Sequence, residues 1–267
     1  MQDSFVDRTG DWDGNWADVP RRIRAGERLA EPWESRFGAL RRRVPAGSAV
    51  TVGQIGQSLD GRIATLSGHA QYVNGAEGLA HLHRLRAIVD AVVVGAGTVR
   101  ADDPRLTVRE VEGPSPARVV IDPRGSLPAS ARAFADDGLR RLVVTRQDTT
   151  LRCADGVETI ALPDTDGVIA PVAILEALAR RGLRRVLIEG GAKTLSHFLS
   201  AGCLDRLHIV VAPVIVGSGI ASLALPPIAR MDEALRMPTQ AHALGDEVLF
   251  DCDLSEQKVE HPGKPRP

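Results

Sequence analysis

Apolar runs and helical patterns alternate along this chain from residue 48 onward. Runs rich in valine, isoleucine and leucine predict strands at 49–57, 90–97, 117–122, 140–146, 184–191 and 205–217. Between these runs, apolar residues at helical spacing predict helices within 74–89, 170–182 and 192–202. Alternation of this kind is typical of an α/β fold, in which helices cover both faces of one mostly parallel sheet.

Local signals refine the ends of these elements. Asn74 and Glu77 stand three residues apart, which predicts an N-cap and a capping box at the start of the first helix. Gly182 predicts the C-terminal stop of the second helix. Near the end of the chain, the segments 239–245 and 246–254 meet at a Gly-Asp pair, and this predicts an antiparallel hairpin.

The first 46 residues differ from the rest of the chain. They hold all three tryptophans and an excess of arginine, and their prolines predict short, interrupted helices. We expect residues 1–46 to form an extension that packs on the main domain through its tryptophans, with a partly disordered tail as the alternative. The main domain then spans 47–255, and 256–267 form a flexible tail.

Composition argues against several classes of partner. The formal net charge is −1 over 267 residues, so no nucleic-acid or membrane partner is expected. Cys153, Cys203 and Cys252 form no CxxC pair, so neither a disulfide framework nor a metal site is expected. No apolar run approaches the ~20 residues of a membrane span, and the N-terminus lacks an apolar signal core. We expect a reduced, cytoplasmic protein.

A glycine turn is the strongest chemical signal. In VLIEGGAKT a predicted strand ends at Glu189, Gly190 and Gly191 turn the chain, and Lys193 and Thr194 lie in the first turn of a helix. Bare backbone N–H groups at a helix start form a cradle for a phosphate or pyrophosphate. An ordinary strand-to-helix turn also favours glycine, so the turn alone leaves both interpretations open.

Two further segments carry candidate chemistry. In GTVRADDPRLTVR, Asp102 lies near Arg109, either as part of a loop ion-pair cluster or as a pocket wall whose arginine binds an anion. In SLDGRIATLSGHAQYVNG, the only tyrosine of the chain, Tyr72, stands in a polar loop. Its ring is suited to stack on a flat heteroaromatic group there, while the alternative is that it simply covers the loop.

Together these segments resemble one known family. SLDGRIAT, LRAIVDAVVVGAGTVRADDPRLTVR, VVIDPRG and IEGGAKTLSHFL are similar, in order and spacing, to the reductase domain of the bacterial riboflavin-biosynthesis deaminase/reductase. The resemblance covers roughly residues 48–252. It implies a dihydrofolate-reductase-like fold: three α/β/α layers around one mostly parallel sheet, with a C-terminal antiparallel hairpin. It also implies a homodimer that uses NADPH to reduce the ribose of 5-amino-6-(5-phosphoribosylamino)uracil to a ribityl chain.

The resemblance assigns roles to individual positions. Glu189 and Asp102 are the implied catalytic residues. The implied cofactor contacts are Gln57, Tyr72, Thr98, Asp102, Pro123, Arg124, Gly190, Gly191, Ala192, Lys193, Thr194 and Leu195. The implied substrate-binding positions are Ala70, Arg86, Leu106, Arg109 and Glu189, with the two arginines facing the phosphate. Arg124 or Arg146 would pair with the 2′-phosphate of the cofactor.

The chain departs from the family pattern in ways that affect the substrate. Tyr72 replaces a tryptophan of many members and keeps a flat ring, whereas Ala70 replaces a serine and loses its hydroxyl. The 46 residues before the domain are too few for the zinc deaminase that precedes it in the bifunctional enzymes, so we expect a separate deaminase. The alternatives are a same-fold NADPH reductase for another pyrimidine or a pteridine, and a non-catalytic nucleotide-binding protein.

Overall fold

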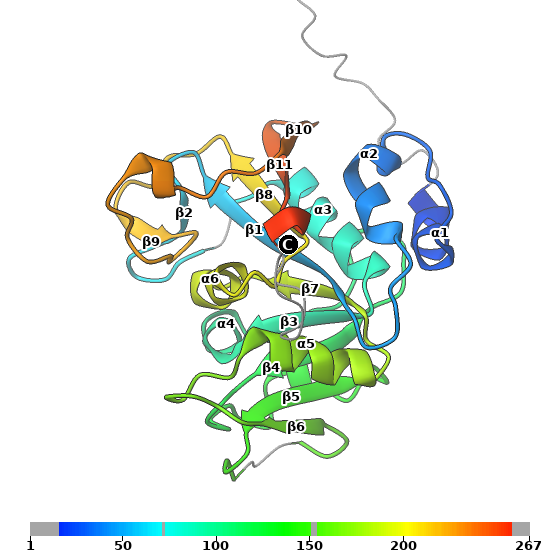
Figure 1. The fold of residues 1–267 in the computed structure, drawn as a ribbon, viewed down its shortest axis with the longest axis vertical. Helices are drawn as coiled ribbons and strands as arrows, with labels where there is room; N and C mark the ends of the chain where they lie inside the picture. The colour runs from blue at the N-terminus through cyan, green and yellow to red at the C-terminus, as the bar shows by residue number, and fades with distance from the viewer. Residues whose placement is uncertain (1–15, 71–72, 151–153, 258–267) are drawn as a thin grey trace, which may run out of the picture.

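Nine strands form one sheet through the body of the molecule (Figure 1). The computed structural model describes residues 16–70, 73–150 and 154–257. The sheet order is β10-β11-β8-β1-β7-β3-β4-β5-β6. The strand bounds are β1 Val50–Ser58, β3 Ala91–Gly95, β4 Ala117–Ile121, β5 Arg141–Arg146, β6 Glu158–Leu162, β7 Arg185–Glu189, β8 Arg206–Ala212, β10 Thr239–Leu244 and β11 Glu247–Asp253.

Strand pairing is parallel from β8 to β6 and antiparallel on both sides of β11. The predicted C-terminal hairpin is therefore confirmed: β10 and β11 pair from Leu244 and Glu247 outward, around the Gly-Asp turn. The mostly parallel α/β sheet is also the one predicted. A separate two-stranded antiparallel ribbon joins β2 Arg62–Thr65 to β9 Gly219–Ala221.

Alternate residues of the central strands supply two apolar cores, as the period of a strand requires. In β3, Val92 and Val94 face one core, while Ala91 and Val93 face the other. α3 Ala76–Ile88 covers the first face together with α1 Val19–Ala25 and α2 Trp33–Phe37. α5 Pro171–Arg180 and α6 Ala192–Ser200 cover the second face, which gives the three layers seen in Figure 1.

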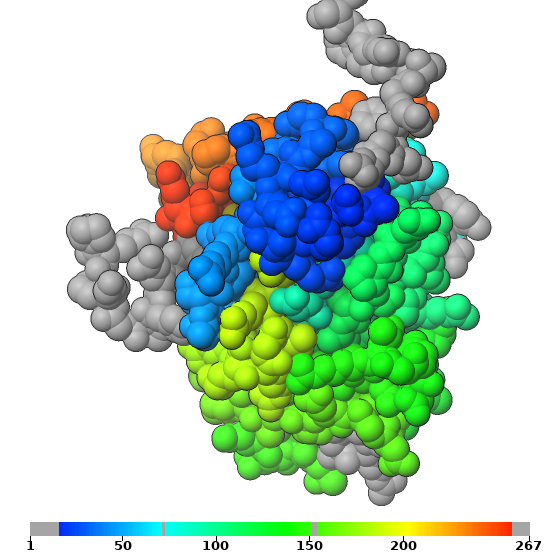
Figure 2. All heavy atoms as spheres, turned by 90° about the vertical axis from the view of Figure 1, so that its right-hand side faces the viewer, coloured from blue at the N-terminus to red at the C-terminus, as the bar shows by residue number. Residues whose placement is uncertain are grey.

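The segment before the sheet packs through its aromatic side chains. Trp16, Trp33 and Phe37 are buried, and their ring centroids lie 5.2–6.0 Å apart. Phe37 also stacks on His81 of α3 at 5.4 Å, so the aromatic cluster reaches the helix that covers the sheet. Figure 2 shows this segment in blue against the body of the molecule. Trp16 and Trp33 thus belong to the apolar core that this segment shares with α3.

The predicted cap of α3 is wrong. Gly75 is the N-cap residue, and the side-chain amide of Asn74 instead donates to the Glu247 carboxylate at 2.7 Å. That carboxylate also accepts the backbone N–H groups of Gly75 at 3.0 Å and Gly78 at 2.7 Å. A residue of β11 therefore stabilises the positive end of this helix, in place of the local capping box.

Four elements were not predicted. These are β2, β6, β9 and the short helix α4 Ala96–Asp102. The strand predicted at 205–217 ends at Ala212, and the chain after it leads into the β2–β9 ribbon. In Figure 1 this ribbon stands beyond the ends of β1 and β8, next to the side of the sheet where α4 and α6 begin.

Candidate active site

A cleft of about 590 Å³ opens at the carboxyl ends of β3, β4 and β7. Its walls come from the start of α4 and α6, from the loop after β4, and from the β2–β9 ribbon. Ligands of open α/β sheets bind outside the carboxyl ends of the strands, which is where this cleft lies. The fold thus brings segments more than 100 residues apart in the sequence to one place.

Two glycines turn the chain into α6, and the second of them, Gly191, lines the cleft. Gly190 and Gly191 have φ of +61° and +58°, and Gly191 has ψ of 106°, a region that residues with a Cβ rarely adopt. A Cβ at Gly191 would lie 2.6 Å from the Thr98 hydroxyl, and one at Gly95 would lie 2.3 Å from the Thr194 hydroxyl. Gly191 and Gly95 therefore leave room for the side chains of Thr98 and Thr194, which line the cleft.

The start of α6 offers unpaired backbone donors. Within the described part of the chain, no side chain caps this helix. The first N–H groups of the helix face the cleft through Ala192, Lys193 and Thr194, and their partial positive charge attracts an anion. The glycine turn and the first N–H groups of α6 thus lie together in the wall of the cleft.

Positive side chains stand around the same cleft. Arg100, Arg124 and Lys193 line it, together with His197. Arg100 donates to Ser126 Oγ. Ser126 Oγ in turn donates to Asp122 Oδ1 at 3.0 Å. Arg146 instead donates from Nε to the Pro123 carbonyl at 3.1 Å and does not line the cleft, so of the two arginines considered for the 2′-phosphate, Arg124 is the one in place.

Asp102 and Asp122 are the carboxylates of the cleft wall. Asp122 is buried, and its Oδ2 accepts the backbone N–H of Leu127 at 2.9 Å, which fixes the loop after β4. Asp102 is exposed at the end of α4, and the partial desolvation of its carboxyl in the cleft raises its pKa above the ordinary value. His197 is also partly desolvated, which lowers its pKa and favours the neutral imidazole.

Glu189 and Arg86 form a buried, bidentate ion pair. Arg86 Nε lies 2.8 Å from Glu189 Oε2, and Nη2 lies 2.5 Å from Oε1. The third guanidinium nitrogen of Arg86 donates to the Thr107 carbonyl at 2.9 Å. With 4% of Arg86 and 9% of Glu189 exposed, the pair is closed to solvent. The expectation that Arg86 faces a phosphate therefore differs from the structure, in which Glu189 and the 103–109 loop occupy its donors.

His83 extends this network to Arg109. Burial, then the charges of Arg86 and Arg109, lower the pKa of His83 to about 3, so its ring is neutral at ordinary pH. Its Nδ1 accepts the backbone N–H of Arg109 at 2.8 Å. The main chain of Arg109 is thus fixed, while its side chain is exposed and donates from Nη1 to Thr107 Oγ1 at 2.8 Å.

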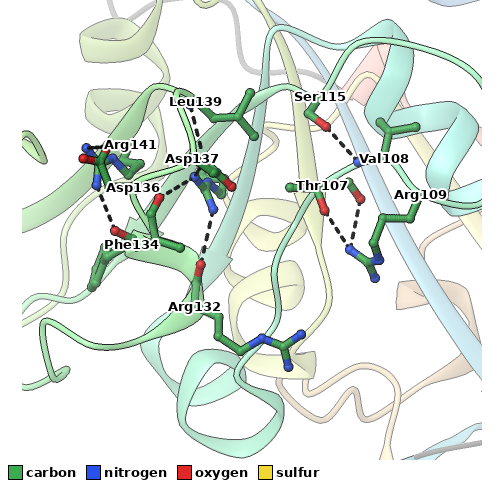
Figure 3. Close-up of polar contacts among 12 residues, drawn as sticks. Thr107, Val108, Arg109, Ser115, Arg132, Phe134, Asp136, Asp137, Leu139 and Arg141 are labelled. Atoms are coloured by element: carbon green, nitrogen blue, oxygen red, sulfur yellow. Dashed lines mark hydrogen bonds and ion pairs between the residues drawn. The ribbon is translucent and has the colours of Figure 1, made fainter.

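Arg109 belongs to a cluster of arginines. Its pKa is lowered by desolvation first and then by the positive charge of Arg86; Glu110 acts against this, and Arg105 and Arg132 add smaller lowering effects. Figure 3 shows Arg109 and Arg132 as side chains on neighbouring segments, with Arg109 bonded to Thr107. An anion bound among Arg105, Arg109 and Arg132 would relieve this mutual repulsion.

The loop that carries the cluster is held by unusual backbone. Asp103 and Leu106 have φ of +38° and +59°. Asp103 Oδ1 accepts the backbone N–H of Arg132 at 2.7 Å, and the Leu106 side chain is fully buried in the core. Leu106 therefore anchors the loop with its side chain, and any contact with a substrate would come from its main chain.

The predicted site residues fall into three groups. Those that line the cleft are Ala70, Thr98, Asp102, Pro123, Arg124, Gly191, Ala192, Lys193 and Thr194. Arg86, Leu106, Arg109 and Glu189 belong to the adjoining network and its loop, and Gly190 connects Glu189 along the chain to Gly191, which lines the cleft. Gln57 lies near the end of β1, and the side chain of Leu195 is fully buried under Gly53 rather than in the cleft. Tyr72 lies outside the described residues.

Sequence reasoning missed several side chains of the site. Arg100, Asp122 and His197 line the cleft, and His83 and Arg132 belong to the arginine network. His83 stands three residues before Arg86, so helical spacing alone could have predicted that the two side chains share one face of the helix. Within the described ranges, no cluster of three or more His, Cys, Asp or Glu side chains suits a metal ion, and no helix is long and apolar enough to span a membrane.

Comparison with known proteins points to one family. The sequence profile described as the RibD C-terminal domain matches residues 50–238. The chain is 35% identical over 175 residues to the 2,5-diamino-6-ribosylamino-4(3H)-pyrimidinone 5′-phosphate reductase of Archaeoglobus fulgidus, covering 61% of this chain and 80% of that protein. It is 31% identical over 199 residues to the riboflavin biosynthesis protein RibD of Aquifex aeolicus, covering 73% of this chain and 54% of that protein.

A solved structure shares the fold. The Thermotoga maritima protein described as a diaminohydroxyphosphoribosylaminopyrimidine deaminase and 5-amino-6-(5-phosphoribosylamino)uracil reductase superposes with a TM-score of 0.68 at 28% identity. The match covers 77% of this chain and 56% of that one. The chain thus spans about half the length of the RibD proteins that it matches and most of the archaeal reductase.

Proposed function

This chain belongs to the RibD C-terminal domain family, and we propose that it is an NADPH-dependent reductase of riboflavin biosynthesis. Its substrate is 5-amino-6-(5-phosphoribosylamino)uracil, whose ribose it reduces to a ribityl chain. The observation that carries this proposal is the pairing of two anion sites: the bare glycine turn before α6, and the arginine cluster of the 103–109 loop. One suits the pyrophosphate of a dinucleotide, and the other suits the phosphate of the substrate.

The cleft fits a dinucleotide cofactor. Because neither Gly190 nor Gly191 carries a side chain, the pyrophosphate can approach the backbone closely. Lys193 and Arg100 add positive charge, and Arg124, which also lines the cleft, would pair with the 2′-phosphate that distinguishes NADPH from NADH. When bound, the cofactor supplies the hydride. Gln57 and Tyr72 are proposed as further cofactor contacts on the family resemblance alone.

The arginine network orients the substrate. Arg109, with Arg105 and Arg132, binds the phosphate, which fixes the sugar carbon in the cleft. Arg86 and Glu189 act as positioning residues: the ion pair holds Thr107, and His83 holds the main chain of Arg109. Glu189 thus supports the chemistry without an exposed carboxylate of its own.

Asp102 is the group proposed to hold a proton in the cleft. The other carboxylate of the cleft wall, Asp122, is buried and bonded to the loop after β4. The raised pKa of Asp102 keeps its carboxyl protonated to a higher pH than an ordinary aspartate, as a general acid requires. The rate of reduction should therefore fall as the pH rises through this raised pKa, and Asp102→Asn should remove that limb of the profile.

A second substrate is favoured by a specific observation. The archaeal relative is named for the 2,5-diamino-pyrimidinone, which still carries the amino group that a deaminase removes, and this chain covers 80% of that protein. Ala70 lines the cleft where the family has serine, so it offers a methyl group in place of a hydroxyl. The order of reduction and deamination depends on which of these two pyrimidines the cleft accepts.

The test compares the two pyrimidines directly. NADPH consumption is followed with each substrate, with dihydrofolate as a control for the fold. Preference for the uracil supports the main proposal and requires a deaminase that acts before this chain, while preference for the diamino compound reverses the order. Reduction of dihydrofolate alone would contradict both. Ala70→Ser measures the contribution of the missing hydroxyl to the KM.

A homodimer is part of the proposal. Large apolar side chains are exposed after β8 and on β11: Val214, Ile215, Val248 and Phe250, with Ile215 73% exposed. They lie in or beside residues 205–217, the strand region that the family resemblance associates with the dimer. Exposed apolar patches of this kind mark association surfaces. Light scattering of the wild type and of Ile215→Asp would measure the oligomeric state, and a wild type that is monomeric at all concentrations contradicts it.

A further inference from the structure

Six arginines surround a hollow at the opposite end of the sheet from the active-site cleft. The hollow has a volume of about 770 Å³ and is lined by Arg24, Arg41, Arg42, Arg43, Arg184 and Arg185, with Asp90. It lies where β7 begins, whereas the cleft lies where β7 ends. Five residues of strand separate the two ends by roughly 17 Å, so the hollow is a separate site.

Two of these arginines are neutralised by carboxylates. Arg41 donates to Glu34 at 2.7 Å, and Arg42 forms an ion pair with Asp205. The four others form no ion pair with any residue in the described ranges. The lining therefore holds four unneutralised guanidinium groups against one carboxylate.

Among the described residues, the donors of Arg24 and Arg185 bind main-chain carbonyls alone. Arg24 donates to Pro20 and Ala87, and Arg185 donates to Leu40 and Ile23, at 3.0–3.2 Å. These bonds fix both side chains but supply no negative charge to balance the guanidinium groups. Desolvation lowers the pKa of Arg185, Asp90 acts against this, and the charge of Arg24 lowers it further.

Arg43 and Arg184 are available to a ligand. Neither guanidinium donates to a protein group in the described part of the chain, and the Nε of Arg184 is buried without a partner. Asp90 does not compete for them: its Oδ2 accepts the backbone N–H groups of Arg184 and Arg185, at 2.9 and 2.7 Å. A buried N–H donor without an acceptor favours an anion that supplies one.

The shape and lining of the hollow define the chemistry of the anion. Its volume is that of a small-molecule site rather than of a single phosphate. The rest of the lining is glycine, alanine and valine, so no aromatic ring is present among the lining residues to stack on a base. Guanidinium groups bind phosphate oxygens in bidentate fashion. We propose that this arginine hollow binds linked phosphate groups, as in a polyphosphate chain or the triphosphate of a nucleotide.

Such a ligand would join two parts of the fold. Arg24 and Arg43 precede the sheet, whereas Arg184 and Arg185 introduce β7. A bound polyphosphate bridges the N-terminal segment to the sheet and stabilises their packing by binding the folded state alone. This role is independent of the reductase activity and does not depend on what the cleft binds.

The test is calorimetric titration of the full chain with tripolyphosphate at about physiological ionic strength. The variant Arg43→Ala/Arg184→Ala removes the two guanidinium groups with no bond to the described protein. It should weaken binding at least ~10-fold. Arg43→Gln/Arg184→Gln, which keeps a polar side chain at both positions without the charge, should do the same. The matched control Arg230→Ala/Arg236→Ala removes the same charge from exposed positions and should bind as the wild type does.

Three results would overturn the proposal: no binding by the wild type, equal binding by the wild type and both hollow variants, or a loss of binding in Lys193→Ala that the hollow variants do not show. The last would place the phosphates at the start of α6. Titration with ATP distinguishes the sources: equal affinity supports phosphates alone, and tighter binding that the hollow variants lose supports a nucleotide. A single-stranded oligonucleotide that binds the hollow more tightly than either would replace the proposal with a nucleic-acid surface.

Discussion

Replacement of Gly191 by alanine should damage both stability and cofactor binding. The backbone at this residue has φ +58° and ψ 106°, and an L-residue held there costs ~1–3 kcal/mol. The added Cβ would also lie 2.6 Å from the Thr98 hydroxyl, and turning that side chain off its rotamer costs a further ~0.5–1.5 kcal/mol. We therefore expect Gly191→Ala to lower the free energy of unfolding by ~2–4 kcal/mol.

The matched control lies in α4, which lines the same cleft. Gly97 is helical, and a Cβ added there would meet no atom within 4 Å, so Gly97→Ala should be neutral or stabilise by up to ~1 kcal/mol. Urea unfolding gives both stabilities, and fluorescence titration with NADPH gives both affinities. Thr98→Ala/Gly191→Ala should recover the stability lost to the steric clash with Thr98 and leave the loss that is due to backbone strain at residue 191. Equal stability and affinity of Gly191→Ala and the wild type would refute the cradle.

Further predictions concern residues outside the turn. Arg109→Ala should raise the KM for the phosphorylated substrate ~10–100-fold at little cost to kcat, and an unchanged KM in steady-state kinetics removes Arg109 from the site. Burial acts to raise the pKa of Asp251 on β11, but its partners His208 and Arg206 outweigh burial and hold this pKa at about 2, against an ordinary 3.8. The contribution of this carboxylate to the free energy of unfolding is thus complete above pH 3.8 and lost as the pH falls towards 2. Asp251→Asn should lower the free energy of unfolding by ~3–5 kcal/mol at neutral pH and flatten the loss of stability between pH 3.8 and 2 in urea unfolding. An unaltered loss of stability in that range would contradict the pairing. Glu247→Ala should lower the free energy of unfolding by ~1–3 kcal/mol, more than Asn74→Ala does, because three donors of the α3 start lose their acceptor; the reverse order would support the local cap.

The central sheet is predictable because its strands are encoded locally. β3, β4 and β5 are buried on both faces, so each appears as a continuous apolar run. β6 was missed because it is an edge strand in which Glu158 and Ala161 are not buried, so its only strong signal is pairing with β5. The cap of α3 failed for a related reason. Asn74 has the right local spacing, but Glu247, 173 residues away, supplies a charged acceptor that outcompetes it.

The candidate site also contains parts that are encoded locally and parts that depend on distant contacts. The glycine turn was predictable because a strand, two glycines and a helix start are contiguous in the sequence. The state of Arg86 was not, because its partner Glu189 lies 103 residues away and the two meet only when α3 packs against β7. The arginine hollow was not predictable either. Its arginines come from separate segments, and their shared enclosure exists only after the N-terminal segment packs on the sheet.

The central claim is that this chain delivers a hydride from a nicotinamide to the sugar carbon of a phosphorylated ribosylaminopyrimidine. The most direct measurement is turnover with NADPH deuterated at the transferring carbon of the nicotinamide, followed by mass spectrometry and NMR of the product. The account predicts a ribityl product with one deuterium on the former ribose C1′, and no such product with Gly191→Ala at a limiting cofactor concentration. Bound NADPH that leaves both candidate pyrimidines unreduced and unlabelled would contradict it.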